Sequence, residues 1–241
     1  MVLFERTDRL GGMIKLAMLP PMRGSYEEII LFGEKQLAKL EVDVRLRVEA
    51  DVKAILAEKP EVVVVATGST PYLPEIPGID GDNVLTVGDV LSGTATGQRI
   101  VIIDTQGTLP ASLVADFLVE QGKQVQIVSG LTWVGNGIYA KAVWHHLYGR
   151  LVGRGVTMLA MTGVSRIREY SLDVYHVVNP NIAWTIKPVD TVVIAAGGQA
   201  DDKLYHKLNG KVEGLYTVGD CAQPRDIEMA TYEAHKVAVA I

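Results

Sequence analysis

The stretch Gly214-Leu-Tyr-Thr-Val-Gly-Asp-Cys-Ala222 decides how this chain is interpreted, because it has the pattern of a short strand that runs directly into an acidic loop. Leu215 and Val218 favour a strand, and Gly219 lets the backbone approach a ligand closely. Asp220 then offers a carboxylate at the carboxyl end of the strand, where open α/β sheets bind ligands. Taken alone, the pattern fits a plain turn equally well. The rest of the chain has to distinguish a nucleotide-contacting loop from a turn.

The composition of the 241 residues, 48% of them hydrophobic, indicates a globular protein with a substantial core. With 23 basic and 28 acidic residues the net charge is -5, which gives no sign of a nucleic-acid partner. The apolar runs are far too short to cross a bilayer. Cys221 is the only cysteine, so these residues alone form neither a disulfide nor a cysteine-ligated iron-sulfur cluster. We therefore expect a cytoplasmic protein with no nucleic-acid and no membrane partner.

The order of the expected elements is typical of an α/β fold with parallel sheets. The β-branched run Val62–Ala66, bounded by Pro60 and Gly68, predicts a strand buried on both faces, and Thr191–Ala196 predicts a second one. Three short strands in succession within residues 163–186 predict a small antiparallel meander. The other expected elements are strands at Val2–Phe4, Val42–Val48, Arg99–Ile103 and Val125–Val128, and helices at Tyr26–Leu40, from about Pro110 to Gly122, at Ala140–Leu151 and from about Arg225 to the end.

These elements predict two interleaved Rossmann-like dinucleotide-binding domains, each built in layers around a parallel sheet. Residues 1–95 together with 199–241 are expected to form a domain of the FAD/ADP-binding type that is incomplete at its N-terminus. Residues 96–198 are expected to form an inserted NAD(P)-binding-like domain.

Two strand ends carry residue types suited to nucleotides. Glu5 ends the first strand, where an acidic residue of a dinucleotide fold accepts the ribose hydroxyls, although a solvated carboxylate explains it equally well. Such a fold carries its glycine loop about 20 residues upstream, so the chain is expected to begin at the second strand of that unit. Ala66-Thr-Gly-Ser69 follows a buried strand, and Gly68 permits close approach to phosphate or ribose.

The inserted unit has a degenerate version of the glycine loop. In Ile103-Asp-Thr-Gln-Gly-Thr-Leu-Pro-Ala111, Gly107 is the only remaining glycine. A carboxylate at Asp104 repels a pyrophosphate, and side chains in place of glycines keep phosphate away from the N-terminus of the helix. The loop therefore argues against NAD(P) binding, although a pyridine-nucleotide site at Gly107 stays an alternative.

Together these motifs resemble the C-terminal region of the trimethylamine dehydrogenase and 2,4-dienoyl-CoA reductase family of flavoproteins. Glu5 with Gly11-Gly12, Ala66-Thr-Gly-Ser69 leading to Pro71-x-x-Pro74-x-x-Pro77-Gly78, and Gly214-x-Tyr-x-x-Gly-Asp220 occur in the family's order. The resemblance extends through Gly219-Asp-Cys-Ala-Gln-Pro-Arg225, and it covers nearly the whole chain.

The resemblance implies an N-terminal TIM barrel with FMN and an iron-sulfur cluster, neither of which this sequence contains, joined to a region that binds FAD or ADP. The implied partner is that barrel, as part of the same protein or a separate subunit, or a second copy of the chain. The implied cofactor-binding residues are Glu5, Arg6, Gly11, Gly12, Ala66, Thr67, Gly68, Gly219 and Asp220, with Gly107 for the second nucleotide. No residue is expected to be catalytic or to bind a metal.

The function implied is that of the nucleotide-binding region of a flavin-dependent oxidoreductase acting on an amine or enoyl substrate, with an electron-transfer or structural role. Two alternatives stay open at this point. One is a docking module without catalytic activity that has lost its cofactor, and the other is a fragment of an NAD(P)H-dependent reductase.

Overall fold

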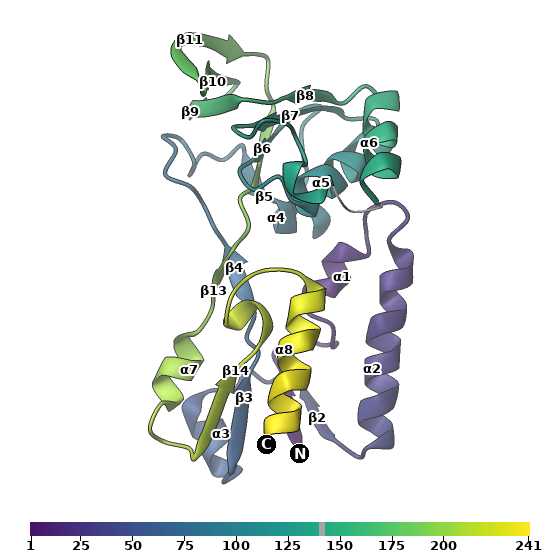
Figure 1. The fold of residues 1–241 in the computed structure, drawn as a ribbon, viewed down its shortest axis with the longest axis vertical. Coiled ribbons are helices and arrows are strands. Elements are labelled where there is room, and N and C mark those ends of the chain that lie inside the picture. The colour runs from purple at the N-terminus through teal and green to yellow at the C-terminus, as the bar shows by residue number, and fades with distance from the viewer. Residues whose placement is uncertain (140–142) are drawn as a thin grey trace. The chain divides into compact units, whose positions relative to one another are not determined.

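The computed structural model describes residues 1–139 and 143–241, and the chain forms two compact units (Figure 1). Unit 1 comprises Met1–Lys15, Ser25–Pro71 and Gly198–Ile241, and unit 2 comprises Leu16–Gly24 and Tyr72–Gly197. Residues 72–95 therefore lie with the second unit, not the first as the sequence suggested. The reason is that β5 (Val84–Thr86) pairs with β12 (Thr191–Ala195), while Val90 and Leu91 of α4 (Val87–Leu91) enter the core of unit 2.

Unit 2 is built on a five-stranded parallel sheet with the strand order β5-β12-β6-β7-β8. The other strands are β6 (Arg99–Asp104), β7 (Gln124–Ser129) and β8 (Thr157–Leu159). All five residues of β12 are buried, as expected for a strand inside a parallel sheet.

Both faces of this sheet are covered, which gives unit 2 three layers. Ile100 and Ile102 of β6 face helices α4, α5 (Leu109–Glu120) and α6 (Val143–Gly153). Val101 and Ile103 face the other way, into a core shared with an antiparallel sheet. That sheet has the order β11-β10-β9 and is the predicted meander, with strands β9 (Thr162–Arg168), β10 (Ser171–His176) and β11 (Asn179–Ile186). The α/β fold with parallel sheets and a small meander is confirmed.

The sheet of unit 1 is divided into parallel pairs. β1 (Val2–Glu5) pairs with β2 (Asp43–Leu46), and β3 (Val62–Val65) pairs with β14 (Gly214–Thr217). A short antiparallel pair joins β4 (Ser69–Pro71) to β13 (Gly198–Ala200). The remaining helices and short turns are α1 (Ile14–Ala17), η1 (Gly24–Tyr26), α2 (Glu27–Lys39), α3 (Val52–Ala57), η2 (Asn136–Ile138), α7 (Lys203–Leu208), η3 (Gly219–Cys221) and α8 (Ile227–Ala240).

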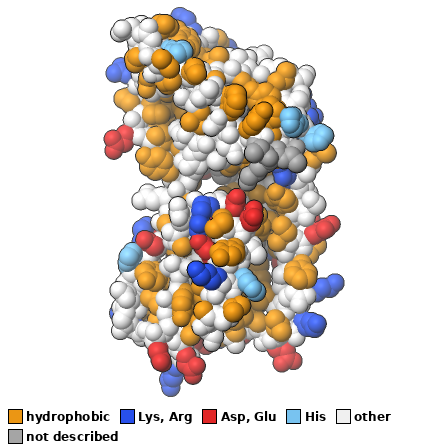
Figure 2. All heavy atoms as spheres, in the orientation of Figure 1, with side chains coloured by type: hydrophobic (Ala, Val, Ile, Leu, Met, Phe, Trp, Pro, Cys, Tyr) orange, Lys and Arg blue, Asp and Glu red, His pale blue; other side chains and the backbone are white. Residues whose placement is uncertain are grey.

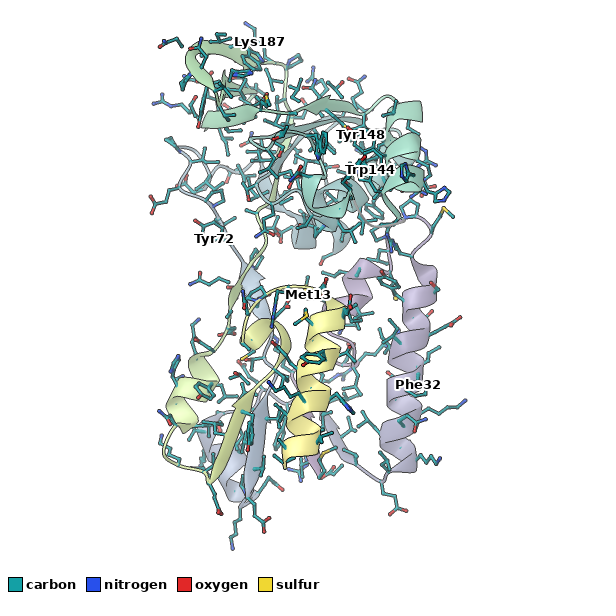
Figure 3. The ribbon with its side chains drawn as sticks, viewed as in Figure 1. Met13, Phe32, Tyr72, Trp144, Tyr148 and Lys187 are labelled. Carbon is teal, nitrogen blue, oxygen red and sulfur yellow. The ribbon has the colours of Figure 1, made fainter. Side chains whose placement is uncertain are left out.

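The expectation that Val62–Ala66 is buried on both faces was wrong. Val62 is 38% exposed and Val64 is 43% exposed, whereas Val65 belongs to a core shared with Ile55, Leu208 and Cys221, and Val63 packs against it partly buried. Among the described residues β3 pairs only with β14, and α8 has no buried residue to cover the strand. Hydrophobic side chains consequently stand at the surface of unit 1 (Figure 2), including Phe32 of α2 and Met13 before α1 (Figure 3).

Two sequence expectations concern the limits of the described structure. The helix expected at Ala140–Leu151 is present as α6 from Val143, whereas residues 140–142 lie outside the described residues. Within the described residues, each helix is too short or too polar to pass through a lipid bilayer.

Helices α5 and α6 are joined by a buried carboxylate. Asp116 of α5 is fully buried, and Arg150 Nη2 donates to its Oδ2 at 2.6 Å. Arg154 reaches the other oxygen only at 3.5 Å and also contacts Glu120 at the surface. A buried charge is costly unless it is paired, so Arg150 rather than Arg154 is expected to stabilise this packing.

Replacing Arg150 with glutamine should therefore lower the free energy of unfolding by about 3 kcal/mol, because Asp116 would stay buried without its close partner. The matched variant Arg154→Gln should cost less than about 1 kcal/mol, as exposed ion pairs do. Urea unfolding followed by tryptophan fluorescence measures both, since Trp133, Trp144 and Trp184 all lie in unit 2. If both variants lost the same free energy of unfolding, the Asp116–Arg150 pair would stabilise the packing no more than the Asp116–Arg154 pair does.

Candidate functional site

The candidate nucleotide site of unit 1 is built where β3 and β14 end. Val65 is the register partner of Thr217, and Val218 N–H donates to the Val65 carbonyl at 3.1 Å. The two turns that follow, Ala66–Gly68 and Gly219–Cys221, are therefore neighbours at the carboxyl ends of parallel strands. This is the edge at which open parallel sheets bind ligands.

Hydrogen bonds fix these two turns to each other. Thr67 Oγ1 donates to the Asp201 carbonyl at 2.5 Å and lies 3.2 Å from Cys221 Sγ. Ser69 Oγ donates to Asp220 Oδ2 at 3.2 Å, and Arg225 N–H donates to Asp220 Oδ1 at 3.2 Å. The Asp220 carboxylate is thus oriented by both turns rather than left to solvent.

The N–H of Gly219 is held by an acid that the sequence reasoning missed. Gly219 has φ +64°, and its N–H donates to Glu233 Oε2 of α8 at 2.9 Å. The other oxygen of Glu233 forms an ion pair with Arg225. Arg225, together with the Gly219 N–H, holds the pKa of the Glu233 carboxyl below its ordinary value. No local motif joins residues 219 and 233, so only the folded chain reveals this contact.

The other predicted residues of unit 1 lie around β1. Glu5 ends β1, and its Oε1 accepts the Thr7 N–H at 2.7 Å, while Arg6 follows on an exposed turn. Gly11 and Gly12 form the turn before α1 with φ +112° and +46°. A Cβ at Gly11 would lie 2.5 Å from Ile30 Cδ1, so close packing against α2 explains this glycine without a nucleotide. Among the described strands, β1 and β3 are not paired with each other.

Gly107 lies in unit 2, in the loop after β6. Asp104, the last residue of β6, is 1% exposed, and its Oδ1 accepts N–H groups of Gly107 at 2.7 Å and Gln106 at 3.2 Å. Asp104 Oδ2 is buried without a hydrogen-bond partner among the described residues. Burial raises the pKa of the Asp104 carboxyl, against the lowering effect of the N–H groups of Gly107, Gln106 and Gly135.

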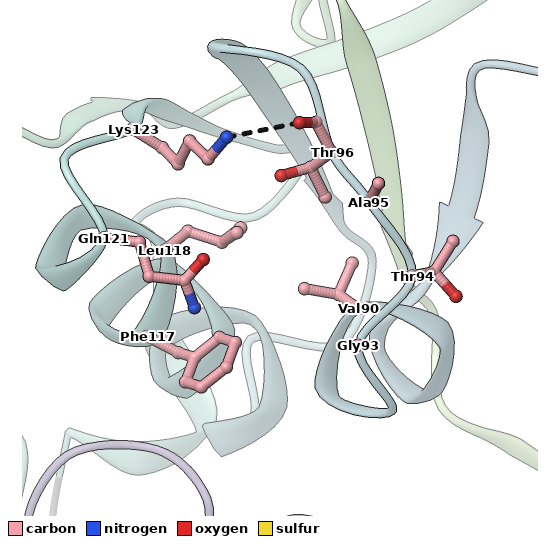
Figure 4. Close-up of a pocket in the computed structure, with 9 residues that line it drawn as sticks. All are labelled: Val90, Gly93, Thr94, Ala95, Thr96, Phe117, Leu118, Gln121 and Lys123. Atoms are coloured by element: carbon pink, nitrogen blue, oxygen red, sulfur yellow. Dashed lines mark hydrogen bonds between the residues drawn. The ribbon is translucent and has the colours of Figure 1, made fainter.

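Two cavities of unit 2 lie away from the carboxyl end of β6. One of about 260 Å³ (Figure 4) lies beside the residues that precede β6 and β7, which is the amino end of those strands. Its cation is already engaged, because Lys123 Nζ donates to the Thr96 carbonyl at 3.2 Å. The residues that line it are Val90, Gly93, Thr94, Ala95, Thr96, Phe117, Leu118, Gln121 and Lys123. A larger one of about 640 Å³ is also lined by residues before β6 and β12. Neither has the position of a dinucleotide site.

The described residues contain no group of three or more histidine, cysteine, aspartate or glutamate side chains that could hold a metal ion. The chemistry of this edge of unit 1 is that of hydroxyls, carboxylates and backbone N–H groups, which suits binding of ribose and phosphate.

Comparison with known proteins gives consistent matches. The family profile described as pyridine nucleotide-disulphide oxidoreductase matches residues 24–239. N,N-dimethylglycine/sarcosine dehydrogenase of Chromohalobacter salexigens is 29% identical over 274 residues, covering 98% of this chain and 39% of that protein. Bilirubin reductase of Mediterraneibacter gnavus is 30% identical over 240 residues, covering 98% and 36%.

A solved structure agrees with these matches. That of 2-naphthoyl-CoA reductase in complex with 2-naphthoyl-CoA superimposes with a TM-score of 0.91 and 28% identity, covering the whole of this chain and 36% of that one. The chain thus spans less than two fifths of the length of these relatives. The matches confirm the resemblance expected from the motifs and the Rossmann-like fold.

The two carboxyls at the loops, Asp104 and Glu233, should respond to pH in opposite directions. The pKa of Asp104 is raised in the folded chain, so its favourable contribution is present at low pH and is lost as pH rises. The stability of Asp104→Asn relative to the wild type should therefore increase between about pH 4 and pH 7.

The pKa of Glu233 is lowered, so its contribution is present at neutral pH and is lost as pH falls. The stability of Glu233→Gln relative to the wild type should consequently decrease over the same interval. Melting temperatures of the three proteins across this range measure both trends. Parallel pH profiles for the two variants would contradict the assignment.

Proposed function

This chain belongs to the pyridine nucleotide-disulphide oxidoreductase family, and from that membership we propose that unit 1 holds the ADP part of FAD, or ADP itself, within a larger flavin-dependent oxidoreductase. The observation that carries the proposal is the register of β3 and β14, which brings Ala66–Gly68 and Gly219–Asp220 together at the carboxyl ends of parallel strands. Relatives named as an amine dehydrogenase and as reductases support an amine or enoyl substrate for the whole enzyme.

The residues of unit 1 suit the adenosine end of such a nucleotide. Glu5 uses Oε1 to accept the Thr7 N–H, which leaves Oε2 to accept a ribose hydroxyl. The Gly219 N–H, held by an acidic side chain, is a donor of the kind that phosphate oxygens accept. Arg225 beside it is a cation that can pair with phosphate. FAD would supply the redox chemistry, and these residues would bind and orient it.

The rest of the enzyme is proposed to contribute a strand as well as the catalytic region. Among the described strands, β1 pairs only with β2 and β3 only with β14, so each has an edge without a partner in a sheet. Unpaired edges bind extended chains, and Val62 and Val64 of β3 lie exposed. A further parallel strand between the two pairs would satisfy both edges and cover these valines. The greater length of the relatives is consistent with such a strand and with a barrel as partner.

An extended chain tests the strand. The segment that precedes the matched region in the Chromohalobacter relative is fused to Met1, and a Gly/Ser segment of equal length serves as the control. We expect the fused segment, but not the control, to raise the melting temperature and to slow amide hydrogen exchange in β1 and β3, because both edges become paired. Exchange that stays fast in both strands would exclude this arrangement.

Calorimetric titration of the extended chain with ADP and FAD tests the nucleotide site. Glu5→Ala should weaken binding at least tenfold, since a hydrogen bond to a charged group is worth about 1.5–3 kcal/mol. The control is Asp43→Ala, at the amino end of the neighbouring strand, which should bind as the wild type does. If neither nucleotide binds, unit 1 is instead a docking module that has lost its cofactor.

A further inference from the structure

Unit 2 carries a carboxylate of its own in the loop where a dinucleotide-binding fold holds phosphate. Such a loop binds phosphate through backbone N–H groups at the start of the helix that follows the first strand. In this chain the N–H groups of Gln106 and Gly107 point at Asp104 Oδ1 instead. Asp104 is 1% exposed, so it is part of the interior and not a mobile surface group. Two N–H donors of the loop are therefore already used by the chain itself.

Other residues of unit 2 pack directly against Gly107. Gly137 N–H donates to the Gly107 carbonyl at 2.9 Å, which fixes the turn η2 against the loop. A Cβ at Gly107 would lie 2.7 Å from Leu131 Cδ1, 3.1 Å from Asn136 N and 3.2 Å from Gly137 N. Where these atoms leave no room for a methyl group, they leave none for a phosphate. The glycine at 107 is therefore explained by contact with residues 131, 136 and 137, not by approach of a nucleotide.

Further residues of this chain lie beside the loop. The carboxamide of Gln106 lies against Gly197, which follows the neighbouring strand β12, although Gln106 is exposed and its side chain can move. Pro110 lies in the first turn of α5 and has no N–H to offer, and the Thr108 side chain forms no cap. The carboxyl end of β6 is thus occupied by the buried Asp104 side chain, and the Gln106 side chain lies beside the end of β12.

We propose that unit 2 has closed its pyridine-nucleotide loop, with the Asp104 carboxylate in the place of the phosphate, and that this unit does not bind NADH or NADPH. The nucleotide implied by the family does not fit the residues present here. The inference is separate from the function proposed above, because Asp104 and Gly107 lie in unit 2 whereas the residues proposed for FAD or ADP lie in unit 1.

Calorimetric titration with NADH and NADPH tests the closure directly. Since both contain an ADP group, binding at unit 1 has to be weakened first, and the Glu5→Ala variant serves for this purpose. We expect NADH and NADPH to bind that variant no more tightly than ADP does, because all three share only the group that unit 1 is proposed to hold. Binding of NADH or NADPH to Glu5→Ala ten or more times tighter than the binding of ADP would overturn the proposal.

Anion rescue tests the role of the Asp104 carboxylate. Asp104→Gly removes the acceptor and should lower the melting temperature, and formate should restore at least half of the loss by entering the vacated site. Sodium chloride at equal ionic strength should not. Ser112→Gly is the control, because it removes another buried polar side chain of unit 2 that binds none of these N–H groups. Formate should have no specific effect on it.

Asp104→Asn provides a second variant if the glycine variant does not fold. It keeps an oxygen that accepts the two N–H groups, so it should fold like the wild type and show no response to formate. A glycine variant as stable as the wild type, or an equal response to formate and chloride, would refute the role of Asp104. A specific formate response in Asp104→Asn would do the same.

Discussion

Buried backbone N–H groups in the turn after a parallel strand must find an acceptor, and much of this structure follows from how that requirement is met. The chain leaves the strand ladder at this point, so the next strand no longer supplies the acceptor. In unit 2 the acceptor is Asp104 of the strand itself, and in unit 1 it is Glu233 of a helix distant in sequence. Asp104 lies in the loop where a dinucleotide fold presents its donors to phosphate, and Glu233 binds an N–H of the turn after β14.

The two units differ in how completely their sheets are covered. In unit 2 the alternation of β6 divides Ile100 and Ile102 from Val101 and Ile103, and each set enters a separate core. A parallel sheet is stable only when both faces are buried, and here helices cover one face and an antiparallel sheet the other. In unit 1 the pairs β1-β2 and β3-β14 form no common sheet, and the core around Val65 is small. The unit proposed to bind the nucleotide is therefore the one whose sheet is less complete.

The sequence predicted most elements because their signals are local. The run Val62–Val65, the two residues Pro110 and Gly122 that bound α5, and the three strands of the meander all depend on neighbouring residues. The prediction that Val62 and Val64 are buried was wrong. A hydrophobic run indicates a strand, but it does not show whether another element packs over that strand. Glu233 was missed for a related reason, because its contact with Gly219 joins a helix to a turn with no shared motif.

The glycines show a similar limit of prediction from the sequence. Gly11 and Gly107 were expected to line nucleotides, yet the close approach that excludes a side chain comes from Ile30 at the first and from residues 131, 136 and 137 at the second. A glycine in a sequence shows that something comes close to the backbone, and only the structure shows whether it is a ligand or the protein. At Gly219 the close neighbour is again the protein, because a Cβ there would lie 3.2 Å from Ala230 Cβ of α8.

Whether a phosphate can replace Glu233 or Asp104 as the acceptor of these N–H groups depends on how exposed the carboxylate is. The Glu233 side chain is 23% exposed and belongs to a helix with no buried residue, and its cation Arg225 could pair with a phosphate after Glu233 moves away. Releasing Glu233 exposes a carboxylate that water solvates well. Asp104 is enclosed by its own loop and the turn at residue 136, so its release requires both to open. The same hydrogen-bonding requirement therefore leaves a replaceable acceptor in unit 1 and a permanent one in unit 2.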